Sequence, residues 1–198
     1  MKNELKLLLI TNYINSLAAG LLAPLYALFV IGLGGTPVQV GVSLCALYLE
    51  AGILIIAFGK LDDKFDKRKM VVAGYFLSAI AFASFYFVQN ITQLYFAQFL
   101  NALAIGVLFP ALKAVYSSLE DKGREASQWS WFDGGNFLIF ALSSLLAGVL
   151  FTTYGFVGLF LLMAAIQLVG AITSLKLLFG GKKHGEKKNE RKASRKRR

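Results

Sequence analysis

Residues 38–59 read VQVGVSLCALYLEAGILIIAFG, and residues 60–69, which follow directly, read KLDDKFDKRK. The first stretch holds a single charged side chain, Glu50, whereas the second is dominated by charge. A helix needs about 20 consecutive, mostly apolar residues to cross a bilayer. The run ILII at residues 53–56 is apolar on every side and lacks the alternation of a transmembrane β-strand. These two stretches therefore predict a membrane-spanning helix that ends in a charged loop.

The same pattern recurs along the whole chain of 198 residues, of which 57% are hydrophobic and 16% are charged. Soluble domains are about a quarter charged, so this composition excludes an ordinary soluble protein. Since a backbone in lipid must satisfy its own hydrogen bonds, we predict an all-α polytopic membrane protein without strands. Its six transmembrane helices are expected at about 6–31, 38–59, 70–88, 93–118, 127–152 and 156–178. The first stretch is longer than the apolar core of a signal peptide, so we expect it to remain as a helix.

The residue types that build metal and covalent sites are nearly absent. Cys45 is the only cysteine and His184 the only histidine, which excludes a disulfide framework and a Cys/His zinc cluster. We see no nucleophile–base pair that would indicate an enzyme. No cofactor and no metal are expected.

The positive charges indicate the topology. If the loops alternate between the two sides of the membrane, all 21 Lys and Arg residues fall on one side. They lie at the N-terminus, in the 60–69 loop, in or near the 119–125 loop and from Lys176 onward, and the three opposite loops have none. Cations resist translocation, so this pattern predicts a multi-pass protein of the plasma (inner) membrane with both termini in the cytoplasm.

Most of the net charge of +10 lies in a C-terminal tail. Residues 180–198 hold ten Lys and Arg against two Glu, and we predict that this tail is disordered and follows a transmembrane domain at residues 1–179. A nucleic-acid-binding domain would spread its cations over a folded surface. We therefore favour anionic lipid of the bilayer over nucleic acid as the partner of the tail.

Polar residues inside the predicted helices are concentrated in the first, second, fourth and fifth helices. The third and sixth helices have few, and we expect them to face lipid as scaffold. The polar side chains of the other four are candidate groups for solute contact and proton coupling: Glu50, Asn12, Asn15, Gln98, Asn101, Asp133 and Asn136.

Glu50 lies near the centre of the second helix, where an ionised carboxylate costs about 3 kcal/mol on insertion scales. We expect this side chain to be protonated until the site opens to water, as a proton- or cation-coupled carrier requires. The alternative is a neutral Glu50 that only hydrogen-bonds a neighbouring helix. A second pair, Lys113 and Asp133, lies at similar depth on adjacent antiparallel helices. Either the two side chains form a buried ion pair, or Lys113 extends to the cytoplasmic surface.

The charged loop after the second helix resembles the signature loop of the major facilitator superfamily, roughly G-x-L-x-D-[RK]-[FL]-G-[RK]-[RK]-[RK]. Asp66 stands in place of the usual Gly. The matching residues are Gly59, Leu61, Asp63, Lys64, Phe65, Lys67, Arg68 and Lys69. In this family the loop braces the cytoplasmic gate, which implies that Arg68 contacts Glu120 or Asp121 at the end of the fourth helix. The implied gate set is Gly59, Asp63, Lys64, Lys67, Arg68 and Glu120.

Further stretches resemble the same family. Residues 97–102, AQFLNA, are similar to its fourth-helix pattern, with Gln98 where the family has Arg. Pro24 and Pro110 lie at nearly the same offset in the first and fourth helices. The resemblance covers residues 1–178 and implies one six-helix half of a carrier, built from two inverted three-helix repeats. In such carriers the first, second, fourth and fifth helices line the cavity, which agrees with the distribution of polar residues.

We therefore predict a half-size secondary active transporter of a small solute. It would work by alternating access as a homodimer, or together with a separately encoded second half, with Glu50 as the candidate coupling carboxylate. The alternative is a non-transporting membrane scaffold or regulatory subunit, or a fragment of a full-length carrier.

Overall fold

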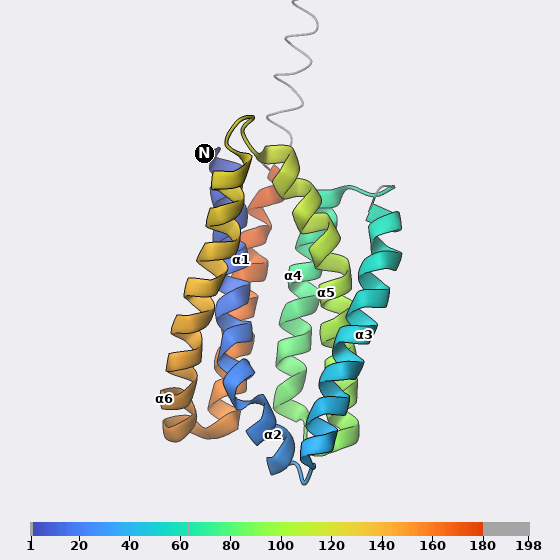
Figure 1. Ribbon diagram of the computed structural model, residues 1–198, viewed down its shortest axis with the longest axis vertical. Helices are drawn as coiled ribbons and strands as arrows, with labels where there is room; N and C mark the ends of the chain where they lie inside the picture. The colour runs from blue at the N-terminus through green and yellow to red at the C-terminus, as the bar shows by residue number, and fades with distance from the viewer. Residues whose placement is uncertain (1, 63, 180–198) are drawn as a thin grey trace, which may run out of the picture.

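The computed structural model describes residues 2–62 and 64–179, and within these ranges every regular element is a helix (Figure 1). Its elements are α1 (Asn3–Leu22), the 3₁₀ turn η1 (Ala23–Leu25), α2 (Tyr26–Gly32), α3 (Pro37–Asp62), α4 (Lys67–Ser84), the 3₁₀ turn η2 (Phe85–Phe87), α5 (Ile91–Leu119) and α6 (Glu125–Ser174). The predictions for Asp63 and for the tail at 180–198 fall outside the described residues.

Five helical segments are long and apolar enough to span a membrane. The last of them, Glu125–Phe179, contains two crossings, because Gly155 has a φ of 63° and interrupts α6. Figure 1 shows the chain reversing direction there, which divides α6 into a first arm (125–154) and a second arm (156–174). Glycine adopts this backbone conformation without steric cost. The six predicted crossings are therefore present in the fold.

The first crossing differs from the single helix expected at 6–31. It runs from Asn3 to Gly32 but passes through the 3₁₀ turn η1, which contains Pro24. Proline has no N–H to donate and clashes with the preceding turn, so a helix is interrupted near it. Pro110 lies inside α5, which continues to Leu119.

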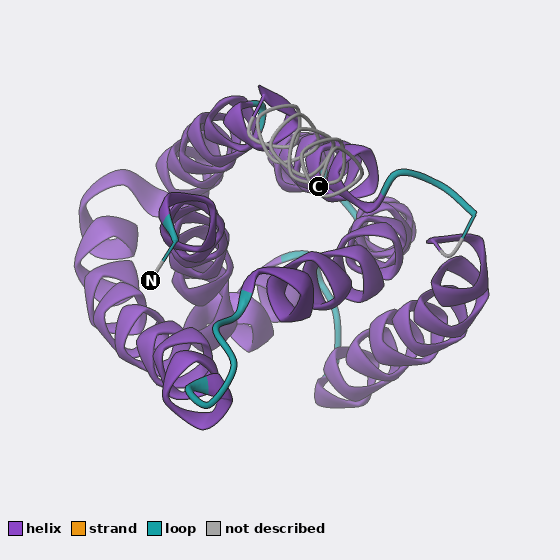
Figure 2. Ribbon diagram, turned by 90° about the horizontal axis from the view of Figure 1, so that it is seen from above, coloured by secondary structure: helices purple, strands orange, loops and turns teal. Residues whose placement is uncertain are grey.

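The two ends of the bundle differ in charge. One end, here called the basic end, holds the start of α1, the loops around 64–66 and 120–124, and the end of the second arm of α6 (Figure 1). The opposite end, the uncharged end, holds the turns at 33–36 and 88–90 and the reversal at Gly155. Viewed from the basic end, the helices stand side by side (Figure 2).

Two stretches that lie 86 positions apart form an internal repeat. Residues 12–24 read NYINSLAAGLLAP and residues 98–110 read QFLNALAIGVLFP, with identical residues at six of the 13 positions. The first stretch runs toward the uncharged end in α1 and η1, and the second runs toward the basic end in α5 (Figure 1). The fold therefore contains two inverted three-helix repeats, as the resemblance implied.

The glycines of this repeat occupy equivalent helix crossings. A Cβ atom added at Gly20 would lie 2.0 Å from Ser143 Oγ and 3.3 Å from the Cα atom of Phe140 in the first arm of α6. A Cβ atom added at Gly106 would lie 2.5 Å from the Cβ atom of Leu54 in α3. Leu54 and Phe140 are themselves 86 positions apart. Small residues thus let α1 and α5 approach their neighbours closely at equivalent positions.

The expectation that the third and sixth helices face lipid is wrong for the third. Half of the most apolar window of α4 is buried, against 17% of that of α3. A Cβ atom at Gly74 of α4 would lie 2.7 Å from the Cβ atom of Leu108 in α5, so these two helices are in close contact. An apolar helix gives no indication of which side is covered when all of its sides are apolar.

Candidate functional site

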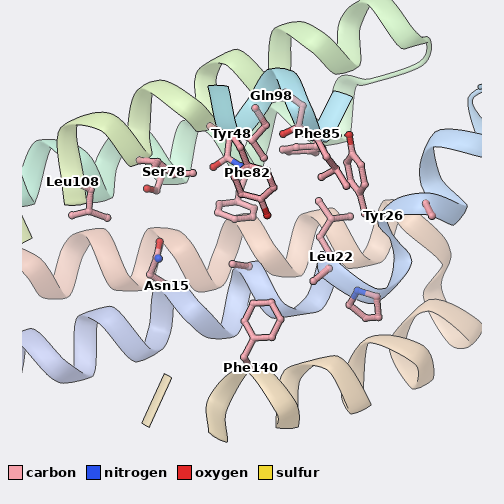
Figure 3. Close-up of a pocket in the computed structure, with 18 of the residues that line it drawn as sticks. Asn15, Leu22, Tyr26, Tyr48, Ser78, Phe82, Phe85, Gln98, Leu108 and Phe140 are labelled. Atoms are coloured by element: carbon pink, nitrogen blue, oxygen red, sulfur yellow. Dashed lines mark hydrogen bonds between the residues drawn. The ribbon is translucent and has the colours of Figure 1, made fainter. Parts of the chain in front are cut away.

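Two adjoining pockets contain most of the predicted polar residues. The larger one, here called the apolar pocket, has a volume of about 430 Å³ and lies among α1, η1, α2, α3, α4, η2, α5 and the first arm of α6 (Figure 3). Its walls include Leu22, Tyr26, Leu44, Leu47, Tyr48, Ser78, Phe82, Phe85, Gln98, Asn101 and Leu108. The smaller one, here called the charged pocket, has a volume of about 300 Å³ and is lined by Asn12, Asn15, Ser16, Phe109, Leu112, Lys113, Phe132, Asp133 and Asn136. Asn15 and Phe109 line both pockets, so the two are adjacent.

The internal repeat relates the two pockets. Six positions that line the apolar pocket have a counterpart, 86 positions away, that lines the charged pocket. The pairs are Gln98 and Asn12, Asn101 and Asn15, Ala23 and Phe109, Tyr26 and Leu112, Ala27 and Lys113, and Leu47 and Asp133. The same local architecture therefore occurs twice, and charged side chains line only one copy.

A chain of hydrogen bonds crosses the apolar pocket. Gln98 Nε2 donates to the hydroxyl of Tyr26 at 2.7 Å, and this hydroxyl lies 2.5 Å from Ser43 Oγ. Ser43 Oγ in turn donates to the carbonyl of Val40 at 2.9 Å. Gln98 is only 2% exposed, and its Oε1 atom has no partner among the described residues. The pocket wall thus offers one enclosed hydrogen-bond acceptor, which is costly to leave unpaired.

Amide side chains tie α1 to both arms of α6. Asn136 Oδ1 accepts hydrogen bonds from Asn12 Nδ2 at 2.9 Å and from Ser16 Oγ at 2.7 Å. Gln167 Nε2, in the second arm, donates to Asn15 Oδ1. Gln167 is fully buried and was not among the predicted site residues. Its only sequence signal is that it is a lone amide in an otherwise apolar helix.

Lys113 and Asp133 line the charged pocket together, but no ion pair joins them. Both side chains are exposed, and neither has a hydrogen bond to any residue that the structure describes. The structure thus brings the two opposite charges into one pocket and leaves them apart.

Glu50 is half-buried and lines neither pocket. Its Oε2 atom is enclosed and has no partner in the described part of the chain. Its counterpart in the repeat is Asn136, which lies 86 positions later and whose Oδ1 atom accepts two hydrogen bonds. The role of Glu50 in proton coupling remains a prediction.

The resemblance implied that Arg68 contacts Glu120 or Asp121. In the structure, Arg68 lies at the basic end and contacts neither of them. Its guanidinium donates to Glu4 Oε2 at 2.8 Å and to the carbonyl of Leu177 at 3.3 Å. The reason is positional: α4 begins beside the start of α1 and the end of the second arm of α6. Glu120 Oε2 is enclosed without a partner among the described residues.

Asp121 instead lies near the first residues of the chain. Lys2 Nζ is 3.6 Å from Asp121 Oδ1 and donates to the carbonyl of Leu119 at 2.7 Å. Asp66, which replaces the Gly of the signature loop, caps α4 by accepting a hydrogen bond from the backbone N–H of Arg68 at 3.0 Å. Capping satisfies an N–H group that a helix start leaves unpaired.

The other residues of the predicted gate set lie around this cluster. Gly59 lies against α5, because a Cβ atom there would be 3.9 Å from Pro110 Cβ. Lys64 is exposed and Lys67 is half-buried. Among residues 2–62 and 64–179, no group of three or more His, Cys, Asp or Glu side chains could hold a metal ion.

Comparison with known proteins places the chain among membrane transporters. The sequence matches the profile of the Major Facilitator Superfamily over residues 8–198. It is 30% identical to multidrug resistance protein MdtG of Dickeya zeae over 175 residues, which are 84% of this chain and 42% of that protein. It is 31% identical to MdtG of Enterobacter lignolyticus over 179 residues, which are 86% and 42% of the two chains. The chain thus spans less than half of the length of these relatives.

Among solved structures, the in meso crystal structure of the POT family transporter PepTSo superposes with a TM-score of 0.61. The identity is 14%, and the superposition covers 88% of this chain and 37% of that transporter. At this identity the likeness concerns the fold alone.

Proposed function

Since this chain belongs to the major facilitator superfamily, a family of transporters and not of enzymes, we propose that it forms one six-helix wall of a secondary transporter of a small solute. The observation that carries this proposal is the pair of adjacent pockets, which gathers polar side chains from α1, α5 and α6. These polar groups lie in an otherwise apolar bundle within a multi-pass membrane protein. Polar groups at membrane depth are costly and generally mark a pathway or a binding site.

A second six-helix unit is needed to complete the pathway. In transporters built from such repeats, the solute binds where two bundles meet, and alternating access results from rocking of one bundle against the other. In this chain α3 is only 17% buried along its most apolar window, and Lys113 and Asp133 are exposed. We infer that a second copy of the chain, or a separately encoded half, covers this face. The basic end would face the cytoplasm, because cations resist translocation.

We further propose that Glu50 couples transport to protons. One oxygen of its carboxyl group is enclosed without a hydrogen-bond partner among the described residues, and an ionised carboxylate at membrane depth is costly. When the bundles rock and the site opens to water, the proton could leave.

The first test is transport by the purified chain in proteoliposomes that enclose a fluorescent pH indicator. Because two relatives are named multidrug resistance proteins, we would use ethidium as the first probe. We expect ethidium movement to depend on an imposed pH gradient and to be accompanied by proton flux. Replacing Glu50 with Gln should abolish the pH dependence. Replacing Glu125, which is exposed at the start of α6, with Gln serves as the matched control.

The second test is the number of subunits, counted by single-molecule photobleaching after extraction in a mild detergent. Two chains per particle would support a homodimer, and one chain together with a co-purifying six-helix protein would support a separate second half. A solitary chain that moves neither ethidium nor protons would contradict the transporter proposal and favour a non-transporting scaffold. Unchanged pH dependence in Glu50→Gln would reject the coupling role alone.

A further inference from the structure

The charged pocket carries one positive and one negative side chain that do not neutralise each other. Lys113 extends from α5 and Asp133 from the first arm of α6, and both line the same pocket of about 300 Å³. Neither has an ion pair or a hydrogen bond to any of the described residues. An isolated charge within a membrane-spanning bundle is expensive, so each charge is expected to serve a purpose there.

The fold itself does not require these two charges. At the equivalent positions of the other repeat, the apolar pocket has Ala27 and Leu47. Those two residues lie 86 positions before Lys113 and Asp133, and both line the apolar pocket. Helix packing is therefore compatible with uncharged residues at both positions, and the charges belong to the specific chemistry of the second pocket.

The other polar side chains of the charged pocket are already engaged. Asn12 and Ser16 both donate to Asn136, and Asn15 accepts from Gln167. These bonds fix the wall and leave the ammonium of Lys113 and the carboxylate of Asp133 as the charged groups open to a ligand. Groups held on rigid helices make a more precise site than groups on loops.

The charged pocket lies next to the apolar pocket. Asn15 and Phe109 line both pockets, and beyond them the apolar pocket presents mainly aliphatic and aromatic side chains, with the enclosed acceptor of Gln98 among them. A ligand that lies across the boundary would thus meet two charges at one end and apolar surface at the other.

We propose that the two pockets together bind a zwitterionic amphiphile. Its cationic group lies against Asp133, its anionic group lies against Lys113, and its apolar part extends past Phe109 into the apolar pocket. Each charge of the pocket then gains a counter-charge and hydrogen bonds, which are about twice as strong when charged groups take part. This inference deepens the proposed function by naming a solute class, and it rests on that function only in treating the ligand as the transported solute.

Binding can be measured without transport, through the thermal stability of the full chain in a non-ionic detergent. The probes are L-phenylalanine, phenethylamine and hydrocinnamate, which share a phenyl group and a two-carbon spacer and carry both charges, only the positive charge or only the negative charge. We expect L-phenylalanine to raise the melting temperature in a saturable way, since ligands that bind only the folded state stabilise it. The two singly charged probes should bind about tenfold or more weakly.

Variants then assign the effect to the pocket. Lys113→Met and Asp133→Asn should each weaken binding of L-phenylalanine about tenfold or more, while Lys122→Met, in an exposed loop, should leave it unchanged. The double exchange of Lys113→Asp with Asp133→Lys should restore binding in part, because both charges are again present. This variant separates a lost charge pair from a damaged fold.

Three results would overturn the proposal: stabilisation by neither L-phenylalanine nor a short-chain zwitterionic lipid, equal stabilisation by a singly charged probe, or a response that the variants of Lys113 and Asp133 do not change. A lipid headgroup has the same zwitterionic chemistry, so short-chain phosphatidylcholine is tested in parallel. A response to this lipid alone, lost in Lys113→Met, would support the zwitterionic site and assign it to lipid. If L-phenylalanine binds but neither it nor ethidium is transported in the proteoliposomes, the transporter proposal fails and the binding site stands.

Discussion

The apolar pocket and the charged pocket occupy equivalent places in two inverted repeats, yet charged side chains line only one of them. Gln98 and Asn101 in one correspond to Asn12 and Asn15 in the other, so the amide groups are retained. The charges of the second pocket replace Ala27 and Leu47 of the first. The comparison indicates that the helix crossings form the two cavities, whereas a few lining side chains determine which ligand chemistry each cavity suits.

The largest expected effect comes from exchanging the chemistry of the two pockets. Leu47→Asp places a carboxylate where the side chain is 7% exposed, and we expect it to lower the free energy of unfolding by about 3 kcal/mol. The reciprocal change, Asp133→Leu, removes an unpaired charge from the bundle and should not lower the free energy of unfolding. Detergent-induced unfolding followed by circular dichroism measures both. Equal losses would mean that the two pockets do not differ in their tolerance of charge.

The second prediction concerns the crossings that create the pockets. Gly106→Ala adds a Cβ atom 2.5 Å from the Cβ atom of Leu54, so a helix must shift, and we expect a loss of about 2 kcal/mol. Gly20→Ala meets chiefly the hydroxyl of Ser143, which can rotate away, and should cost less. Gly148→Ala, with nothing within 4 Å, is the control and should not destabilise. The same unfolding assay ranks the three variants by their loss of unfolding free energy. An equal loss at all three glycines would contradict the proposed role of the crossings.

The third prediction concerns the hydrogen bonds of the apolar pocket. Tyr26→Phe removes the hydroxyl that accepts from Gln98 Nε2, and an enclosed donor without a partner should cost about 1 kcal/mol. The double variant Tyr26→Phe with Gln98→Leu removes both partners and should be more stable than Tyr26→Phe alone. Melting temperatures of the three proteins decide this, and a double variant that is less stable than the single one would show that Gln98 has another role.

The smallest effect is expected for the amide pair of the charged pocket. A double-mutant cycle of Asn12→Ala and Asn136→Ala should give a coupling energy of about 0.6 kcal/mol, the average for hydrogen bonds between membrane helices. A parallel cycle of Asn12→Ala with Thr152→Ala, whose side chain is exposed and bonds only within its own helix, should give none. Absence of coupling between Asn12 and Asn136 would mean that this pair does not hold α1 against α6.

The six crossings and the four helices rich in polar residues could be predicted because they depend on composition along the chain. Apolar length predicts a span, and the position of each polar residue within it predicts the depth. The choice of neighbour could not be predicted in the same way. Arg68 contacts Glu4 and Leu177, not Glu120 or Asp121, because its partner depends on which helix ends lie together.

The sequence also does not predict which side of an apolar helix packs against its neighbours. Gln167 is a lone amide, and only the packing of the second arm of α6 on α1 shows that it meets Asn15. The burial of α4 depends on Gly74, whose close contact with Leu108 is invisible in a helix that is apolar all round. The similarity between residues 12–24 and residues 98–110 is visible in the sequence. The prediction of a repeat rested on Pro24 and Pro110 alone.

The cluster around Arg68 has a consequence for the biosynthesis of the chain. Arg68 can meet Glu4 as soon as α4 has been inserted, but the carbonyl of Leu177 lies 109 residues further along. At typical rates of translation, roughly 5–20 s pass between the synthesis of these two residues. The early helices are therefore in the membrane before Arg68 can contact the carbonyl of Leu177, and this contact forms only after the second arm of α6 has been synthesised.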